Sequence, residues 1–211
     1  MSHGWRDISI ALGPGTPEWP GDTPYSCRWT QQLARGDTVN LSALTASPHV
    51  GTHADAPLHV HDGWPASDDL PIDAFQGPAT VCAFDRLDTL PNARVERLLL
   101  RTGCSSARGT FPAEWPALSV RQVDVLLARG LKLLGVDAPS VDARHSTGLE
   151  VHHALFGGGA YNLENLDLRD VADGEYDLVA LPVRIVGLDA APVRAVLRPN
   201  AAPSDVKPLD M

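Results

Sequence analysis

The chain has 211 residues, 44% of them hydrophobic and 20% charged, which is the balance of a folded domain with a sizeable core rather than of a disordered chain. Its formal net charge of −9 would repel phosphate backbones, no apolar run reaches the length of a membrane span, and the first ten residues lack a signal pattern. Three cysteines without a close pair argue against a disulfide framework, so we expect reduced thiols, a cytoplasmic location, and no nucleic-acid or membrane partner.

The first informative element is the stretch 47–61, SPHVGTHADAPLHVH, which holds four histidines within thirteen residues. A helix cannot gather His49, His53 and Asp55, because Asp55 would point roughly 200° away from His53. A straight strand puts all three on one face, but it holds His49 and His53 about 13 Å apart, too far to share one ion. Gly51 permits a bend between them. The stretch therefore predicts a strand end, a tight turn and a short extended segment.

These residue types indicate a metal site. Histidine and carboxylate ligands without thiolate suit zinc, manganese or iron, and three protein ligands leave a position for water, as in catalytic sites. Asp55 has two oxygens and can bridge to a second ion, for which His152, His153 and Glu164 are candidate ligands. Spacing does not choose between the two histidines, and we expect only one to face the site. Glu164 lies among apolar residues, where a carboxylate is costly unless it is paired or metal-bound.

Five short apolar runs between turn signals have the lengths of strands. They cover residues 79–85, 95–102, 131–137, 176–189 and 192–198. Strands outnumber helices, which favours an α/β or mixed β fold. No linker divides the chain, so we expect a single domain over 1–211, with 199–211 as a C-terminal arm or tail.

Two helices are predicted. The first follows Ser119, which forms a capping box with Gln122, and it ends at Gly130. The second covers about residues 146–156 and ends at the triple glycine 157–159. That glycine run lacks the Lys-Ser/Thr that follows in a phosphate-binding loop, so it is interpreted as a helix stop.

The segment SPHVGTHADAPLH resembles the signature of the metal-dependent cyclase-like hydrolases, His-x-Gly-Thr-His-x-Asp-Ala-Pro-x-His. Within that superfamily, LLGVDAPSVD, HHALFGGGAYNLENLDL and LPVRIVGLDAAPVRAVLRP are similar to the bacterial kynurenine formamidases, and the resemblance covers nearly the whole chain. It implies a swivelling mixed α/β domain of the β/β/α kind, a homodimer, and two divalent metal ions per subunit, zinc or alternatively manganese.

The resemblance also implies metal ligands. His49, His53 and Asp55 would hold the first ion. Asp55 would bridge to the second ion, which His152 would also bind, and Glu164 would contact both. His152, rather than its neighbour, follows from a separation of twelve residues from Glu164, as in the family.

The activity that the resemblance implies is hydrolysis of N-formyl-L-kynurenine, a small aryl formamide, to kynurenine and formate. His59 would be the proton shuttle and not a ligand, and Trp19 would contact the substrate. A metal-activated water would be the nucleophile, and His59 would pass its proton to the aniline nitrogen. Trp64 is a weaker candidate for the pocket wall, and His61 is expected in an outer shell or on the surface.

Three alternatives stay open. His53, Asp55 and His152 also match the His-x-Asp…His pattern of the facial triad in non-haem iron oxygenases. This interpretation leaves the other candidate ligands unexplained. A relative that opens isatin or a cyclic imide would share the metal motif and differ only in its pocket. An inactive relative or metal carrier would keep the ligands without turnover.

Overall fold

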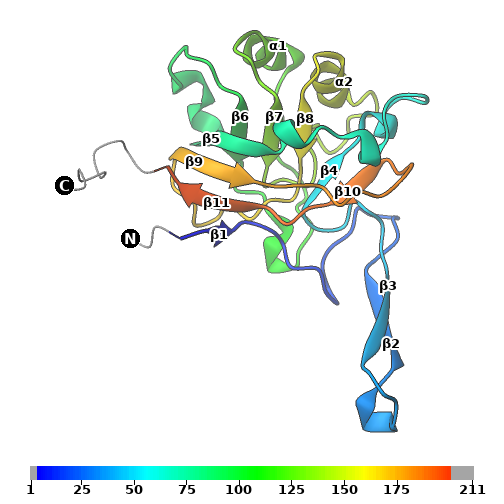
Figure 1. Ribbon diagram of the computed structural model, residues 1–211. Coiled ribbons are helices and arrows are strands. Elements are labelled where there is room, and N and C mark those ends of the chain that lie inside the picture. Colours follow the sequence, from blue (N-terminus) through cyan, green and yellow to red (C-terminus); the bar gives the residue numbers. More distant parts are fainter. Residues whose placement is uncertain (1–3, 201–211) are drawn as a thin grey trace, which may run out of the picture.

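A seven-stranded sheet forms the centre of the computed structural model, which describes residues 4–200 (Figure 1). Its strands are β1 (Arg6–Asp7), β5 (Gln76–Ala83), β6 (Arg97–Arg101), β7 (Leu133–Val136), β8 (Tyr161–Leu163), β9 (Gly174–Val179) and β11 (Val196–Pro199). Their order is β1-β11-β9-β5-β6-β7-β8. Strands β5 to β8 run parallel, whereas β9, β11 and β1 pair antiparallel. This mixed sheet confirms the predicted α/β class.

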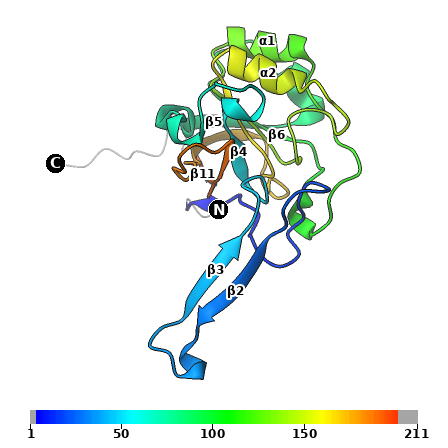
Figure 2. The same ribbon diagram turned by 90° about the vertical axis from the view of Figure 1, so that its right-hand side faces the viewer.

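Both faces of the sheet are covered at β6 and β7, where every residue but Arg101 is buried. In β6, Leu98 and Leu100 join the core beneath the helices, whereas Leu99 joins the core on the opposite face. The helices α1 (Val120–Ala128) and α2 (Glu150–Gly157) lie together over one face (Figures 1 and 2). Uninterrupted apolar runs such as the one in β6 are what a parallel sheet with two covered faces requires.

The first helix follows its prediction and the second begins later. The Ser119 hydroxyl accepts a hydrogen bond from the Gln122 amide at 3.3 Å, and the Gln122 side chain accepts one from the Ser119 amide at 3.0 Å. The predicted start of the second helix near residue 146 is wrong, because Leu149 is left-handed (φ 47°) and helical geometry starts at Glu150. None of the helices in residues 4–200 combines the length and hydrophobicity that crossing a membrane requires.

Two of the predicted strands differ from the structure near the C-terminus. The predicted strand 176–189 ends at Val179, since Pro182 follows and the chain leaves the sheet. Residues 190–192 form β10 (Ala190–Pro192), which pairs with β4 (His53–Asp55) outside the main sheet, so β11 begins only at Val196. Of the predicted arm 199–211, Pro199 is the last residue of β11, and residues 201–211 lie outside the described part of the chain.

A two-stranded arm, which the sequence did not predict, projects from the body of the molecule (Figures 1 and 2). It consists of β2 (Ser26–Gln31) and β3 (Leu41–Thr45), paired antiparallel. Trp29 is 55% exposed on it, and Leu44 is 69% exposed. The arm therefore offers apolar side chains that nothing in the described chain covers.

Short 3₁₀ turns connect several of these elements. They cover Leu33–Arg35, Pro57–His59, Ser67–Asp69, Ile72–Ala74, Phe84–Thr89 and Ser106–Arg108. All three cysteines of the chain are unpaired, as predicted. The turn Pro57–His59 matters most for the site, because it directly follows β4.

Candidate metal and active site

The histidine stretch bends where the sequence predicted. Gly51 has φ +73°, and a Cβ atom there would lie 2.6 Å from Cδ2 of Leu12, so the position favours glycine on two grounds. The extended segment that follows is only the three residues of β4. The turn Pro57–His59 then carries His59 back toward β4.

Backbone pairing on both sides holds β4 in place. On one side it pairs with β10, where Ala190 lies opposite Asp55. On the other, the amide of His53 donates to the carbonyl of Glu164 at 3.3 Å, and the amide of Glu164 donates to the carbonyl of His53 at 3.0 Å. This reciprocal pair explains how two residues far apart in sequence bring their side chains to one place.

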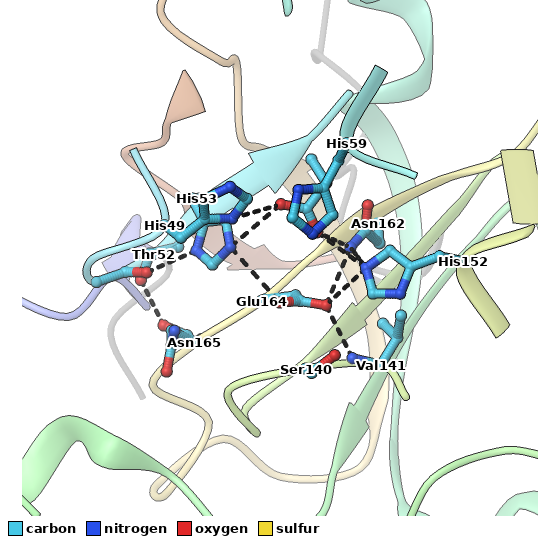
Figure 3. Close-up of polar contacts among 12 residues, drawn as sticks. His49, Thr52, His53, His59, Ser140, Val141, His152, Asn162, Glu164 and Asn165 are labelled. Atoms are coloured by element: carbon cyan, nitrogen blue, oxygen red, sulfur yellow. Dashed lines mark hydrogen bonds and ion pairs between the residues drawn. The ribbon is translucent and has the colours of Figure 1, made fainter. Parts of the chain in front are cut away.

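Four buried side chains form an inner cluster, defined as His53, Asp55, His152 and Glu164. Nε2 of His53 lies 3.3 Å from Oδ1 of Asp55 and 3.5 Å from Oε2 of Glu164. Nε2 of His152 lies 3.1 Å from Oδ2 of Asp55 and 3.3 Å from Oε1 of Glu164. Figure 3 shows the imidazoles of His53 and His152 on either side of Glu164. Each carboxylate thus presents one oxygen to each imidazole.

The inner cluster fits a divalent cation. Within residues 4–200, Nε2 of His53 and Oδ1 of Asp55 are buried and have no hydrogen-bond partner. Such orphaned polar atoms are costly unless something else satisfies them. Ligand atoms of His53, Asp55 and Glu164 lie within 4.8 Å of one another, and so do those of His49, Asp55 and His59. Nitrogen and oxygen donors without thiolate suit zinc or manganese.

The far side of each inner imidazole is also engaged. Nδ1 of His53 lies 2.9 Å from the carbonyl oxygen of Gly51, and Nδ1 of His152 lies 2.6 Å from Oδ2 of Asp142. Contacts of this kind accept the Nδ1 proton and leave Nε2 with a lone pair toward the cluster, as second-shell partners of metal-ligating histidines do. The choice left open by spacing is thereby answered: His152 faces the cluster, while His153 is exposed.

Sequence reasoning missed two residues of this inner region. The carboxylate of Asp142 accepts from the amides of Val151 and His152 and so caps α2 as well as orienting an imidazole. The side-chain amide of Asn162 donates to Asp55 at 2.6 Å and to Glu164 at 3.1 Å. One signal was available for Asn162: it lies two residues before Glu164 near the end of β8, and such residues share a face of a strand.

The remaining polar side chains form an outer group, defined as His49, His59 and Asp189. Nδ1 of His49 lies 3.0 Å from Oδ1 of Asp55, which joins the outer group to the inner cluster. Oδ2 of Asp189 lies 3.0 Å from Nε2 of His49 and 3.2 Å from Nδ1 of His59. Asp189 was not predicted. The outer side chains are 18% (His49), 28% (His59) and 43% (Asp189) exposed, unlike those of the inner cluster.

The charges of the site stabilise one another. Burial alone would raise the pKa of Asp55, but the charge of His53 and the close contacts of the histidines with its carboxylate outweigh it and hold that pKa well below its usual value. Burial likewise opposes protonation of His53 and His49. The neighbouring carboxylates nevertheless raise the pKa of His53 to about 9 and of His49 to about 10. When no metal is bound, protonated imidazoles therefore balance the negative charge of the carboxylates.

A cavity of about 290 Å³ opens onto both groups. Its wall includes Trp19, Phe111, Ser140 and Asn165 together with the histidines. Trp19 is 40% exposed and meets Phe111 edge-on, with ring centroids 5.5 Å apart. Trp64 is not part of this wall and instead stacks on His61, which is exposed as expected. The arrangement thus places an aromatic wall beside a polar floor.

Known proteins share both sequence and fold with this chain. A family model described as "Putative cyclase" matches residues 6–143. The kynurenine formamidase of Salinibacter ruber is 46% identical over 205 residues, which cover 91% of this chain and 96% of that protein. A solved structure of a potential metal-dependent hydrolase with cyclase activity has a TM-score of 0.80 at 25% identity and covers 94% of this chain and 99% of its own.

A second solved structure, isatin hydrolase A from Ralstonia solanacearum, shares the fold with a TM-score of 0.75 at 20% identity, over 93% of this chain and 92% of its own. Its identity is low enough that only the fold follows from it. The match to a kynurenine formamidase, at 46% identity, decides the branch. The resemblance predicted from the histidine motif is confirmed: the chain belongs to the cyclase family, in the branch that includes the kynurenine formamidases.

Proposed function

We propose that this protein is a metal-dependent kynurenine formamidase, which hydrolyses N-formyl-L-kynurenine to L-kynurenine and formate. The observation that carries the proposal is the inner cluster of two imidazoles bridged by two carboxylates at the floor of an aromatic-walled cavity. The sequence similarity of this chain to a kynurenine formamidase, over nearly its whole length, gives the substrate class. An aryl formamide matches the site, since its ring suits the aromatic wall and its amide the polar floor.

The proposed metal complement is two zinc ions per subunit, with manganese as the alternative. His49, His53 and Asp55 would hold the first ion, Asp55 and His152 the second, and Glu164 would contact both. Support comes from the carboxylates of Asp55 and Glu164, each of which directs one oxygen to each inner imidazole. Bound divalent cations supply a water of lowered pKa and positive charge opposite the developing oxyanion.

The chain's own residues would handle the protons and the substrate. His59 lines the cavity and would take a proton from the attacking water as its oxygen bonds to the formyl carbon. As the C–N bond breaks, His59 would return that proton to the aniline nitrogen, which leaves as the amine of kynurenine. Trp19 and Phe111 would hold the aryl ring during both steps.

Two other activities are weaker candidates. Hydrolysis of isatin is supported only by the shared fold. The oxygenase alternative requires two histidines and one carboxylate. Here a second carboxylate, that of Glu164, lies beside both His53 and His152, and this ligand set does not suit a facial triad.

A parallel assay tests the proposal. Protein purified without chelator is analysed for its metals and then given N-formylkynurenine, isatin, or ferrous iron with oxygen. We expect bound zinc or manganese and stoichiometric release of formate from N-formylkynurenine, at a much higher kcat/KM than for isatin. Faster opening of isatin, or oxygen consumption without formate release, would reject the formamidase assignment.

We also propose a homodimer in which a second copy of the chain covers the arm β2–β3. The arm exposes Trp29, Leu41 and Leu44, and isolated two-stranded ribbons are marginally stable in water. Light scattering should give twice the monomer mass for the native protein. The double variant Trp29→Ser/Leu44→Ser should shift it toward monomer, whereas Val125→Ser, at a 52% exposed position on α1, should not.

The proposed compartment is the cytoplasm. All three thiols are unpaired, which suits a reducing environment. Fractionation of the producing cells, followed by formamidase assay of each fraction, checks this location.

A further inference from the structure

Asp189 brings a side chain from the C-terminal part of the chain into the site. Its backbone carbonyl accepts a hydrogen bond from the amide of Ala56 at 2.8 Å, directly beyond β4. The next residue, Ala190, pairs with Asp55 in the β10–β4 ribbon. The backbone of Asp189 is therefore fixed to the same strand that carries the inner carboxylate.

The carboxylate of Asp189 is directed at histidines and at no other side chain in the described chain. Oδ2 lies 3.2 Å from Nδ1 of His59 and 3.0 Å from Nε2 of His49. No lysine or arginine within residues 4–200 forms an ion pair with it. A half-exposed carboxylate without a lysine or arginine partner in the described chain, aimed at the ring of a cavity histidine, is placed as an orienting group.

We propose that Asp189 is a positioning residue for His59, an inference that rests on the formamidase mechanism given above. By accepting the Nδ1 proton, it selects the His59 tautomer whose Nε2 is unprotonated and able to take a proton. It also restricts rotation of a ring that sits on a short 3₁₀ turn, with its centroid 4.5 Å from that of His49 and 5.7 Å from that of His152. Carboxylates that orient metal-ligating histidines are worth about 10–100-fold in metal affinity or activity, and we expect a loss of the same order for the orientation of His59.

The contact with His49 offers a competing route, since Asp189 would then act by holding a metal ligand. The two routes make different predictions. Through His59, loss of Asp189 lowers kcat with the metal content unchanged. Through His49, it lowers metal affinity, and the effect persists when His59 is absent.

The test is a double-mutant cycle on the metal-loaded enzyme, with Asp189→Ala, His59→Ala and the double variant. We expect Asp189→Ala to lower kcat about 10–100-fold, with KM within about twofold, an unchanged metal content and an unchanged melting temperature. In the His59→Ala background the same substitution should cost less than about twofold, because its target is gone.

A matched control comes from Asp68, whose carboxylate accepts from the amide of Gly187 at 2.8 Å and so anchors the same segment without contacting a histidine. Asp68→Ala should leave kcat unchanged. The inference is overturned by an equal loss in Asp68→Ala, by an undiminished Asp189→Ala cost in the His59→Ala background, by loss of metal, or by no loss of kcat. If instead His59→Ala retains full turnover, the formamidase mechanism itself fails.

Discussion

The inner cluster and the outer group share one cavity but differ in how they are held. The inner side chains are at most 5% exposed, lie on β4, on α2 and at the end of β8, and have further contacts that fix their orientation. The outer side chains are 18–43% exposed and lie on turns and loops. A buried cluster with fixed side chains suits the binding of a metal ion. Proton transfer, by contrast, needs groups that water and substrate can reach. We propose that the inner cluster binds metal together with His49, and that His59 and Asp189 of the outer group handle protons.

Removing the inner carboxylate should have the largest effect. Asp55→Ala deletes both oxygens that lie between His53 and His152, so we expect loss of both metals and loss of detectable turnover. Elemental analysis and formate release measure the two outcomes. Asp62→Ala, at an exposed position of the same segment, is the control and should change neither. Full metal content with activity in Asp55→Ala would refute the bridging role.

Removing the outer histidine should separate the two functions. His59→Ala should keep the metals and lower turnover by roughly 10²–10⁴, the usual worth of general acid–base catalysis. His61→Ala is the matched control, because His61 is exposed and stacks on Trp64. The result also answers a geometric question, since His59 lies within ligand distance of His49 and Asp55. Loss of metal in this variant would make His59 a metal ligand, like His49, and would refute its role as the proton shuttle.

Metal affinity should depend steeply on pH. In the metal-free protein the pKa of His53 is raised to about 9 and that of His49 to about 10, so a metal must displace both protons at neutral pH. Affinity should therefore rise by up to about 100-fold per pH unit between pH 7 and 9. Calorimetry in buffers of different ionisation enthalpy should show release of at least two protons, since contacts with carboxylates also raise the pKa of His152 well above its usual value. Release of no protons would mean that the imidazoles are neutral before metal binds.

The raised pKa values of His49 and His53 also make the stability of the metal-free fold depend on pH. A pKa raised above its unfolded value of 6.5 contributes stability that is fully present below pH 6.5 and is lost as pH rises through 9 to 10. The melting temperature of the metal-free protein should thus fall across this window. The metal-loaded protein, whose imidazoles carry no such protons, serves as the control and should not show that fall.

The sequence predicted the part of the inner cluster on β4, because the geometry of that part is local. Odd spacing and Gly51 were enough to require a bend before His53 and Asp55, and the structure has that bend. Which of the two adjacent histidines faces inward depends on how α2 is oriented. That orientation is set by Asp142, a contact that spacing cannot reveal.

The outer group was harder to predict because it depends on tertiary contacts. Asp189 lay in an apolar run that had the length of a strand, so its role as a loop carboxylate beside His59 had no local signal. The arm was missed for a related reason. Its strands are short and exposed on both faces, and they lack the alternation that marks a half-buried strand.

The smallest predicted effect concerns the aromatic wall, which extends the outer region beyond its charged groups. Trp19→Ala should raise KM about tenfold and leave kcat and metal content within about twofold, because an aromatic contact is worth about 0.5–1.5 kcal/mol beyond area burial. Trp5→Ala is the matched control, since Trp5 is similarly exposed but packs under Arg198. A fall in kcat at unchanged KM would show instead that Trp19 shapes the catalytic groups, and the aromatic wall would then belong with the proton-handling residues rather than with substrate binding.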